Sequence, residues 1–383
     1  MKLSSTYVTR ALICGTGLFL ISLVNASSIY PVGSTPKYLI VIDLNQDGIS
    51  DIVTANFNSN NISVLMGRSD GTFAPAVNYA VGVNPTSLAP ADFNGDGKMD
   101  LATANVNNNC PTCTGSVSLL LGNGDGTFQQ PAVSVAVDGT SAAVAAAHLN
   151  MDRLADLVVG DTTQLFVLLG RGNGTFLTPA AYATGEVPHN IVVWDFNMDG
   201  KPDTVSANYN SNNVSVLLGA GSGDFRPAVN YPVGTKPHEV VLADLNGDNL
   251  LDLITANQNS NNISVLLSNG DGTFQPAVNY PSSPNPSSIA TGDFNGDGRT
   301  DLAISNSGCL SGVTCTFGGT DVTVLLNMGN GVFQAAGTYV LGSGAAAIRS
   351  GDFDRDGKLD LAIGCLANNS VIVLFGNGDG TFR

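Results

Sequence analysis

Three features of the sequence predict an all-β fold, a seven-bladed β-propeller of four-stranded antiparallel blades. A nine-residue acidic motif recurs seven times, and its copies start 47 to 59 residues apart. Short runs rich in Val, Ile and Leu alternate with clusters of Asn, Asp and Gly, which is typical of strands joined by tight turns. After the first 26 residues no stretch combines helical periodicity with helix caps. A repeat of this length indicates a propeller or a solenoid, and four strands per repeat favour the propeller.

The N-terminal segment 1–26 predicts a cleaved signal peptide. Lys2 and Arg10 precede an apolar run from Ala11 to Val24, and Val24-Asn25-Ala26 has the small-residue pattern of a cleavage site. The run is shorter than the roughly 18 residues that a spanning helix needs, and no later apolar stretch reaches that length. We therefore expect a secreted protein, or a periplasmic one in a Gram-negative host. Residues 27–383 would form the propeller, with no membrane span after cleavage.

Residues 237–281 illustrate one repeat. Strands are expected over 237–245, 252–257, 263–269 and 274–281, separated by Asn-rich or Gly-rich turns. The last repeat ends at residue 383 without most of its fourth strand, whereas SSIYPVG near the N-terminus matches AVNYPVG at 228–234. We therefore expect the N-terminal strand, from about Ile29, to complete the seventh blade and close the ring. Closure leaves only short, protected sheet edges.

The recurring motif has the pattern of a cation-binding loop. In DFNGDGRTD, residues 293–301, side-chain oxygens at positions one, three, five and nine and the carbonyl at position seven can converge on one ion. Glycine at position six allows the sharp turn. Calcium fits because it accepts six to eight oxygen ligands in flexible geometry. An EF-hand is excluded because position twelve holds Thr, Val, Ser or Ile rather than Glu; an ion-free Asx turn is the alternative.

These loops and strands resemble the FG-GAP/VCBS repeats of bacterial secreted proteins, the propeller class of the integrin alpha-subunit head. The resemblance covers about residues 29 to 383. The literal Phe-Gly and Gly-Ala-Pro signatures are replaced by GTFxPA, as in Gly272 to Ala277, and no inserted metal-dependent adhesion domain is present. Integrin-type ligand recognition is therefore not implied. In that family DxDxDGxxD loops bind calcium, and the resemblance implies such ligands here.

Carried over position by position, the implied calcium ligands are Asp43, Asn45, Asp47, Ile49, Asp51, Asp92, Asn94, Asp96, Lys98, Asp100, Asp195, Asn197, Asp199, Lys201, Asp203, Asp244, Asn246, Asp248, Leu250, Asp252, Asp293, Asn295, Asp297, Arg299, Asp301, Asp352, Asp354, Asp356, Lys358 and Asp360.

The seven loops are not equivalent. The third has His148 at position one and Arg153 in place of glycine, so we expect it to be empty or weak, with Asn150, Asp152 and Asp156 as its remnants. That leaves about six calcium sites. The fifth has Asn249 in place of glycine, and Asn tolerates the left-handed conformation. The seventh has Asp354 at position three and thus four carboxylates, so we expect it to bind calcium most tightly.

The charge distribution narrows the possible partners. The chain has a net charge of −16, and 21 of its 31 acidic residues lie in the seven loops. Nucleic-acid binding needs basic patches, so we exclude it. No G-x-S-x-G motif and no Ser/His/Asp set is recognisable, which argues against an enzyme.

Six cysteines suggest two local disulfides. Cys110 and Cys113 lie in an insertion of the second repeat, and Cys309 and Cys315 in an insertion of the sixth. In an exported chain local disulfides are expected; shared zinc and a redox pair are the alternatives. Cys365 is left over, and we expect it to be a buried thiol in or beside a strand.

Strand parity assigns the loops to two faces. The acidic loops and the NGDGTF turns share one face, which we call the metal face. The Asn-rich loops, the cysteine insertions and the PVGxxP connections share the opposite one, which we call the variable face, and loops of this kind commonly carry function. His189 and His238 occupy equivalent places there near the channel, so they are candidates for ligand contact, with repeat variation as the alternative.

The aromatic residues of the NYP and GTF segments recur with the repeat and are expected to pack between blades, and Trp194 is expected in the core. Taken together, the sequence favours a monomeric, calcium-stabilised extracellular scaffold for binding or adhesion, with a glycan or a protein as ligand. The alternatives are a propeller-type hydrolase or lyase with its active site at the channel, and a passive structural module.

Overall fold

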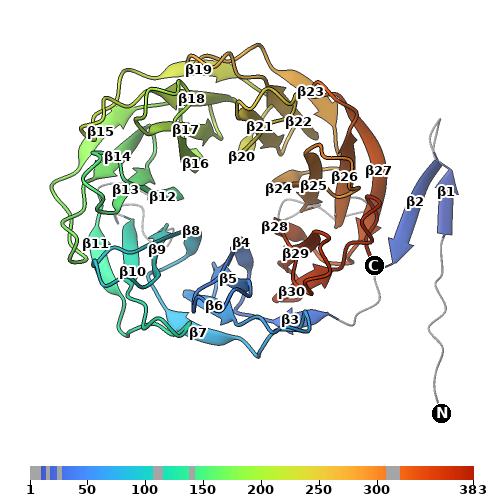
Figure 1. The fold of residues 1–383 in the computed structure, drawn as a ribbon, viewed down its shortest axis with the longest axis horizontal. Helices are drawn as coiled ribbons and strands as arrows, with labels where there is room; N and C mark the ends of the chain where they lie inside the picture. Colours follow the sequence, from blue (N-terminus) through green and yellow to red (C-terminus); the bar gives the residue numbers. More distant parts are fainter. Residues whose placement is uncertain (1–9, 14–17, 24–27, 107–114, 138–142, 308–319) are drawn as a thin grey trace.

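The computed structural model describes residues 10–13, 18–23, 28–106, 115–137, 143–307 and 320–383. Seven antiparallel sheets are arranged radially around a central channel, and the first strand of each blade lies innermost (Figure 1). Every regular element of the described residues is a β-strand. The predicted all-β, seven-bladed propeller is confirmed. In these ranges no helix is long and apolar enough to cross a membrane.

The blades are numbered here in chain order. Their strands, from the channel outward, are β4 (Pro36–Ile42), β5 (Asp51–Asn56), β6 (Asn61–Leu65) and β7 (Val77–Ala80) in blade one; β8 (Pro85–Ala91), β9 (Asp100–Asn105), β10 (Ser116–Leu120) and β11 (Val133–Ala136) in blade two; β12 (Ala143–Ala147), β13 (Asp156–Gly160), β14 (Gln164–Leu168) and β15 (Ala180–Ala183) in blade three; β16 (Pro188–Trp194), β17 (Asp203–Asn208), β18 (Asn213–Leu217) and β19 (Val229–Pro232) in blade four; β20 (Pro237–Ala243), β21 (Asp252–Asn257), β22 (Asn262–Leu266) and β23 (Val278–Pro281) in blade five; β24 (Pro286–Gly292), β25 (Asp301–Asn306), β26 (Asp321–Asn327) and β27 (Phe333–Val340) in blade six; and β28 (Ala345–Gly351), β29 (Asp360–Cys365), β30 (Ser370–Leu374) and β3 (Ile29–Pro31) in blade seven.

The N-terminal strand closes the ring, as predicted. Strand β3 pairs antiparallel with β30, with Ile29 opposite Ile372. Backbone bonds on both sides extend the pairing, from Val32 N–H to the carbonyl of Asn369 (2.9 Å) and from Val373 N–H to the carbonyl of Ser28 (3.0 Å). The seventh blade is therefore built from both ends of the chain.

Two further strands lie outside the ring (Figure 1). Strands β1 (Arg10–Ile13) and β2 (Leu18–Leu23) form a hairpin, and β2 runs parallel to β27, so this sheet contains six strands. Both strands fall within the segment 1–26 expected to be a signal peptide. Cleavage of that segment remains a prediction.

The core consists of apolar layers shared by adjacent blades. The second strand of every blade is buried along its whole length, and in the third strand nearly every residue is buried. In one such layer Val205 and Val216 of blade four pack with Leu253 and Leu266 of blade five. The large apolar residues of the second and third strands are thus buried in contacts between blades.

The recurring aromatic residues join neighbouring blades, as expected. Phe73 of blade one makes edge-to-face contacts with two rings of blade seven, Tyr30 at 5.3 Å and Phe353 at 5.6 Å between ring centroids. Such pairs contribute about 0.5–1.5 kcal/mol beyond their buried area. The expectation for Trp194 is wrong, because its side chain is 51% exposed. Trp194 ends β16 opposite Asp203, where the innermost strand reaches the metal face and the inter-blade core stops.

Cys365 ends β29 as a free, buried thiol, which confirms the expectation, and burial raises its pKa to about 12. Cys110, Cys113, Cys309 and Cys315 lie outside the described residues, so the two disulfides remain predictions.

Candidate functional site

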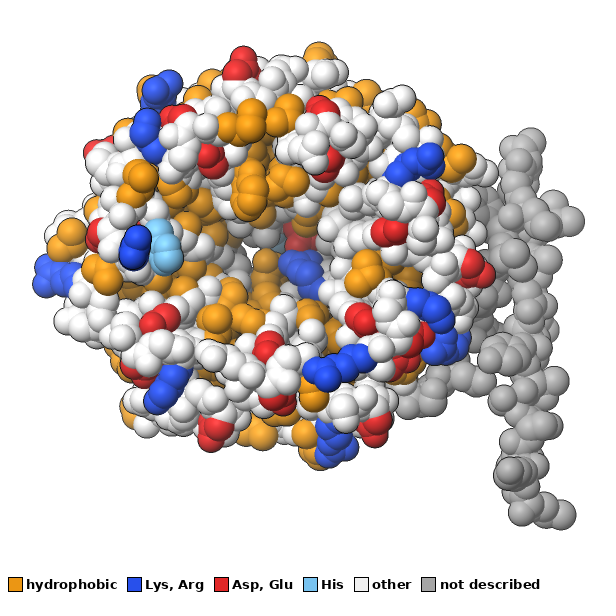
Figure 2. All heavy atoms as spheres, viewed as in Figure 1, with side chains coloured by type: hydrophobic (Ala, Val, Ile, Leu, Met, Phe, Trp, Pro, Cys, Tyr) orange, Lys and Arg blue, Asp and Glu red, His pale blue; other side chains and the backbone are white. Residues whose placement is uncertain are grey.

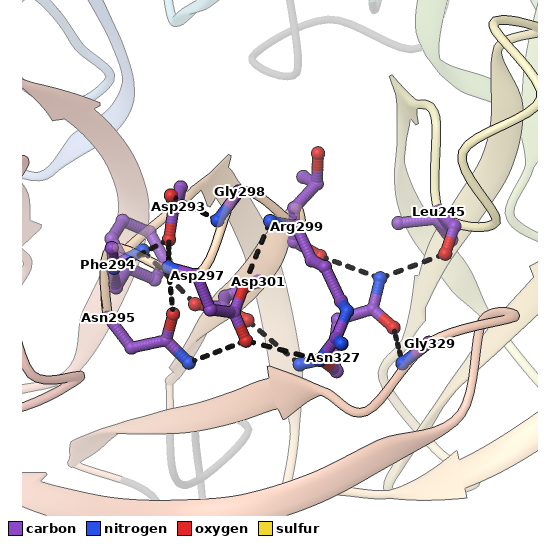
Figure 3. A network of polar contacts seen from close by, with 12 residues as sticks. Leu245, Asp293, Phe294, Asn295, Asp297, Gly298, Arg299, Asp301, Asn327 and Gly329 are labelled. Atoms are coloured by element: carbon purple, nitrogen blue, oxygen red, sulfur yellow. Dashed lines mark hydrogen bonds and ion pairs between the residues drawn. The ribbon is translucent and has the colours of Figure 1, made fainter.

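The acidic loops join the first and second strands of each blade, and the sixth, residues 293–301, illustrates their geometry (Figure 3). The carboxylate of Asp293 accepts hydrogen bonds from the backbone N–H groups of Gly296 (2.8 Å), Asp297 (3.1 Å) and Gly298 (2.8 Å). The side-chain oxygen of Asn295 accepts the N–H of Asp297 at 2.9 Å. These donors gather the oxygens of positions one and three around a single backbone turn. The turn therefore places potential ligands together before any ion arrives.

Position nine has a second role that the motif alone did not reveal. Asp301 is fully buried; one carboxylate oxygen accepts the N–H of Phe294 (3.1 Å) and the other that of Asn327 (2.8 Å). The same pair of bonds, to position two and to the start of the following hairpin, recurs in all seven blades. Asp156 keeps both bonds in the third loop. The presence of an aspartate at position nine in this otherwise degenerate loop was a signal in the sequence that position nine has a structural role.

Burial raises the pKa of every position-nine carboxyl, and the pKa values of Asp252 and Asp360 reach about 6. Nearby loop carboxylates add to the shift. A divalent cation in the loop would favour the ionised form, since an opposite charge at short range lowers a carboxyl pKa. The electrostatics of the ninth position are therefore suited to a bound cation.

Left-handed residues shape the loops at two positions. Position six has a positive φ throughout, from 65° at Asn249 to 82° at Gly357, so the predicted need for glycine or Asn is explained. In the third loop Arg153 adopts this conformation at φ 68°. Position four is left-handed as well, including Gln46, Met198 and Arg355, and sequence reasoning missed it because these residues are not glycines.

The seventh loop has the best donor set for a metal. Asp352, Asp354 and Asp356 bring carboxylate oxygens within 4.8 Å of one another, and among the described residues this is the only such cluster of acidic, His or Cys side chains. Carboxylate oxygens are the donors that calcium prefers, so the residues fit the ion that the motif implies. In the other six loops Asn occupies position three, so a neutral amide oxygen replaces one carboxylate.

The third loop lacks the central acceptor, as expected. His148 is exposed, and the loop N–H of Met151 bonds to the backbone carbonyl of His148 at 3.3 Å instead of to a side chain. Asp152 still accepts the N–H of Leu154 at 2.8 Å. The turn thus forms without the position-one carboxylate, which accepts the backbone N–H groups of the other loops.

Basic residues at position seven contact the acid at position five. The ion pairs are Lys98 with Asp96 (3.8 Å), Lys201 with Asp199 (3.1 Å), Arg299 with Asp297 (3.3 Å) and Lys358 with Asp356 (3.1 Å). A hydrogen bond from Lys358 lowers the pKa of Asp356. These pairs are exposed and contribute little to stability, so they neutralise charge without competing strongly with a divalent ion.

A second candidate site lies at the other end of the channel. A cavity of about 470 Å³, which we call the channel pocket, is formed by the first residues of the innermost strands and by residues directly after the second strands. Its lining includes Lys37, His189, Tyr209, His238, Gln258 and Ser287. Because innermost strands begin at the variable face and end at the metal face, the pocket opens on the variable face.

His189 and His238, both predicted from sequence, line this pocket side by side with ring centroids 4.1 Å apart. The Nδ1–H of His189 donates to the carbonyl of His238 (3.2 Å), and that of His238 to the carbonyl of Ser287 (2.8 Å). Burial lowers the pKa of His238 to about 4 and that of His189 well below its usual range, and Lys37 contributes to both shifts. Both rings are therefore neutral at pH 7, and each Nε2 carries a lone pair.

An ion pair beside the pocket connects blades five and seven. Arg349 of blade seven bonds to Glu239 of blade five at 2.8 Å and to the hydroxyl of Ser288 in blade six at 3.0 Å. The second oxygen of Glu239 accepts the N–H of Ile289 at 2.7 Å. Burial opposes the charge of Arg349, but Glu239 and Tyr38 more than offset it, so the pKa of Arg349 is raised. Figure 2 shows basic and acidic side chains inside the hollow centre of the ring.

The structure therefore defines a seven-bladed β-propeller that has acidic loops at one end of its channel and a polar pocket at the other. The FG-GAP-like repeat model matches residues 43–103, 148–203, 195–255, 244–304 and 313–363, which together span more than half of the chain. The chain belongs to the FG-GAP-like repeat family. Among curated protein sequences, none matches it significantly.

Solved structures share the fold at low identity. A lectin of Agrocybe aegerita, described as recognising non-reducing terminal N-acetylglucosamine, is 20% identical with a TM-score of 0.55, covering 90% of this chain and 92% of the lectin. Hydrazine synthase of Kuenenia stuttgartiensis is 14% identical with a TM-score of 0.61, covering 93% and 99%. BBS1N in complex with ARL6DN is 11% identical with a TM-score of 0.60, covering 90% and 93%. These likenesses concern the fold alone.

Proposed function

We propose that the protein is a secreted, monomeric binding scaffold, stabilised by calcium in about six of its loops, that holds a glycan in the channel pocket. The observation that carries the proposal is the pocket itself. A concave site with an aromatic ring and several convergent hydrogen-bonding groups is the usual form of a small-ligand site. A flat protein-binding surface would not need this depth, so we favour a glycan over a protein ligand.

The loops support a stabilising role for calcium, because they lie at the opposite end of the channel from the pocket. Extracellular calcium modules bind the ion at roughly 10⁻⁴–10⁻³ M, which matches the exported state expected from residues 1–26. Six ions would also reduce the mutual repulsion of the loop carboxylates. In this proposal calcium holds the ring together, and the chain's own pocket residues contact the ligand.

A glycan array and a protein pull-down, each run in calcium and in chelator, test the proposal. We expect glycan retention in calcium, a loss of retention for Tyr209→Ala, and unchanged retention for Arg171→Gln, which alters an exposed turn on the metal face. The Tyr209 phenol donates to Gln258 at 2.7 Å, so the variant removes both a ring surface and a positioned hydroxyl. Glycan binding that survives Tyr209→Ala unchanged, in a folded variant, contradicts the assignment to the pocket.

A hydrolase or lyase acting in the same pocket is the second candidate. It is favoured by one observation, the gathering of His189, His238, Tyr209 and Lys37 within reach of a buried carboxylate, Glu239. Release of reducing ends or of unsaturated sugars from a retained glycan would support it. We favour binding without catalysis, since Glu239 is already held by Arg349 and by a backbone N–H.

A further inference from the structure

We propose that the channel pocket selects saccharides that carry a carboxylate, because the ammonium of Lys37 is the one charge in its described lining without an oppositely charged partner. The inference rests on the proposed glycan-binding function and specifies the class of sugar. Uronic acids have this chemistry, since they combine a carboxylate with ring hydroxyls.

The charge of the pocket is opposite to that of the protein. Its single carboxylate, Glu239, is committed to Arg349 at 2.8 Å and to the N–H of Ile289 at 2.7 Å. Lys37 remains, and within the described residues its ammonium has no hydrogen bond or ion pair, only the face of the Phe57 ring at 3.6 Å. With Arg349 counted as the partner of Glu239, the pocket and its surroundings carry one net positive charge in a chain of net charge −16.

The position of Lys37 makes an anionic ligand favourable. It lies in the second position of β4, exposed to the channel but surrounded by the ring, and burial lowers its pKa. A bound carboxylate would stabilise this partly desolvated charge, and the low-dielectric walls would strengthen the attraction. A positively charged or amine-bearing ligand would be repelled for the same reason.

Other pocket groups match the hydroxyls of a sugar. The Nε2 lone pairs of His189 and His238 have no hydrogen-bond partner in the described part of the chain, so they can accept from ligand hydroxyls. Gln258 is only 8% exposed, and its oxygen accepts the hydroxyl of Tyr209. Its amide N–H groups have no partner among the described residues either, and the amide nitrogen is accessible to solvent. Gln258 therefore offers donors to a ligand in the pocket.

A ligand needs both a carboxylate and hydroxyl groups to use all the polar groups of the pocket. A simple anion such as acetate would engage Lys37 but leave the histidine lone pairs and the Gln258 amide unused. A neutral hexose would use those groups but not the ammonium. A uronate monosaccharide can use all of them at once, and it is small enough for a cavity of about 470 Å³.

Calorimetric titration of the calcium-loaded protein with matched ligands tests the proposal. The probes are D-galacturonate against D-galactose, D-glucuronate against D-glucose, and acetate. We expect each uronate to bind at least about tenfold more tightly than its neutral partner and than acetate. Lys37→Gln should abolish the preference for uronate, whereas Lys37→Arg should keep it. Arg171→Gln, which removes one exposed positive charge far from the pocket, is the matched control and should behave like the parent.

The outcomes separate this inference from the proposed function. Equal affinity for uronate and neutral sugar overturns the carboxylate preference while glycan binding stands. Acetate binding as tight as that of galacturonate also overturns it, by indicating a simple anion site. If the folded, calcium-loaded parent binds no sugar at all, both proposals are overturned. Loss of the preference in Arg171→Gln would attribute it to overall charge rather than to Lys37, which again contradicts the proposal.

Discussion

Replacing Asp360 with Ala separates the structural role of the ninth loop position from its metal role. In the parent its two carboxylate oxygens accept the backbone N–H groups of Phe353 and Gly376, each at 2.8 Å, and both bonds are buried. Truncation leaves two buried donors without partners, and each costs about 1–3 kcal/mol. The gross loss of unfolding free energy is therefore about 2–6 kcal/mol.

An opposing contribution applies when calcium is absent. Burial raises the pKa of Asp360 from 3.8 to about 6, so at pH 7 the ionised carboxylate carries an electrostatic cost of about 3 kcal/mol in the folded protein. The variant is free of that cost, so its net change in chelator lies between a gain of about 1 kcal/mol and a loss of about 3 kcal/mol. With calcium bound, the parent also gains about 2.7 kcal/mol per site at 100 times the dissociation constant. The loss caused by Asp360→Ala should therefore be several kcal/mol larger in calcium than in chelator.

Asp156→Ala in the third loop is the matched control. Asp156 accepts the N–H groups of Leu149 (2.8 Å) and Gly170 (2.7 Å), but its loop lacks the acidic residue at position one. Denaturant unfolding at pH 7 should give a loss for Asp156→Ala that is the same in calcium and in chelator. The reasoning fails if the loss for Asp360→Ala does not depend on calcium, or if the loss for Asp156→Ala depends on it equally.

Three further predictions concern the whole ring. Chelation of the parent should lower its melting temperature markedly, because several sites each contribute free energy, and elemental analysis should find about six calcium ions per chain; an unchanged melting curve contradicts this. Deletion of residues 27–34 removes β3 and exposes the edge of β30, so light scattering should detect aggregation, whereas a monomeric deletion variant that melts like the parent would indicate another mode of closure. Because burial lowers the pKa of His238 to about 4, the unfolded chain binds one more proton than the folded chain between pH 6.5 and about 4, and stability falls as the pH falls through this range. Relative to His238→Gln, the parent should lose about 1.5 kcal/mol between pH 6.5 and 5, and parallel stability curves would refute the shift.

Sequence patterns predicted the fold well because each blade repeats one local rule. Strand runs, left-handed glycines such as Gly298 and the match between the two chain ends are all visible within about 50 residues, and they gave seven blades and the closure. The aspartate at position nine was interpreted only as a calcium ligand. Its carboxylate also accepts hydrogen bonds from backbone N–H groups, and a pattern of side chains cannot show these bonds.

The channel pocket was only partly predictable. His189 and His238 stood out because they occupy equivalent places in adjacent repeats. Glu239 and Arg349 did not, because they are 110 positions apart and meet only when the ring places blades five and seven on either side of blade six. Trp194 was expected in the core, but it is exposed because the end of an innermost strand lies beyond the layer of inter-blade contacts.

Closure of the ring by β3 also determines when the protein can finish folding. Thr35 and Asn369, which bond across this closure, are 334 positions apart, whereas strands within a blade meet across separations such as 15. Loop-closure cost rises by about 0.6 kcal/mol per doubling of separation, so the final pairing is disfavoured by about 3 kcal/mol relative to a local one. We expect blades to form early and the two ends to join last, as in other folds dominated by distant contacts. The seventh sheet cannot be completed until residue 374 has been synthesised. Before that point the chain is an incomplete ring, and the blades at both of its ends can still unfold.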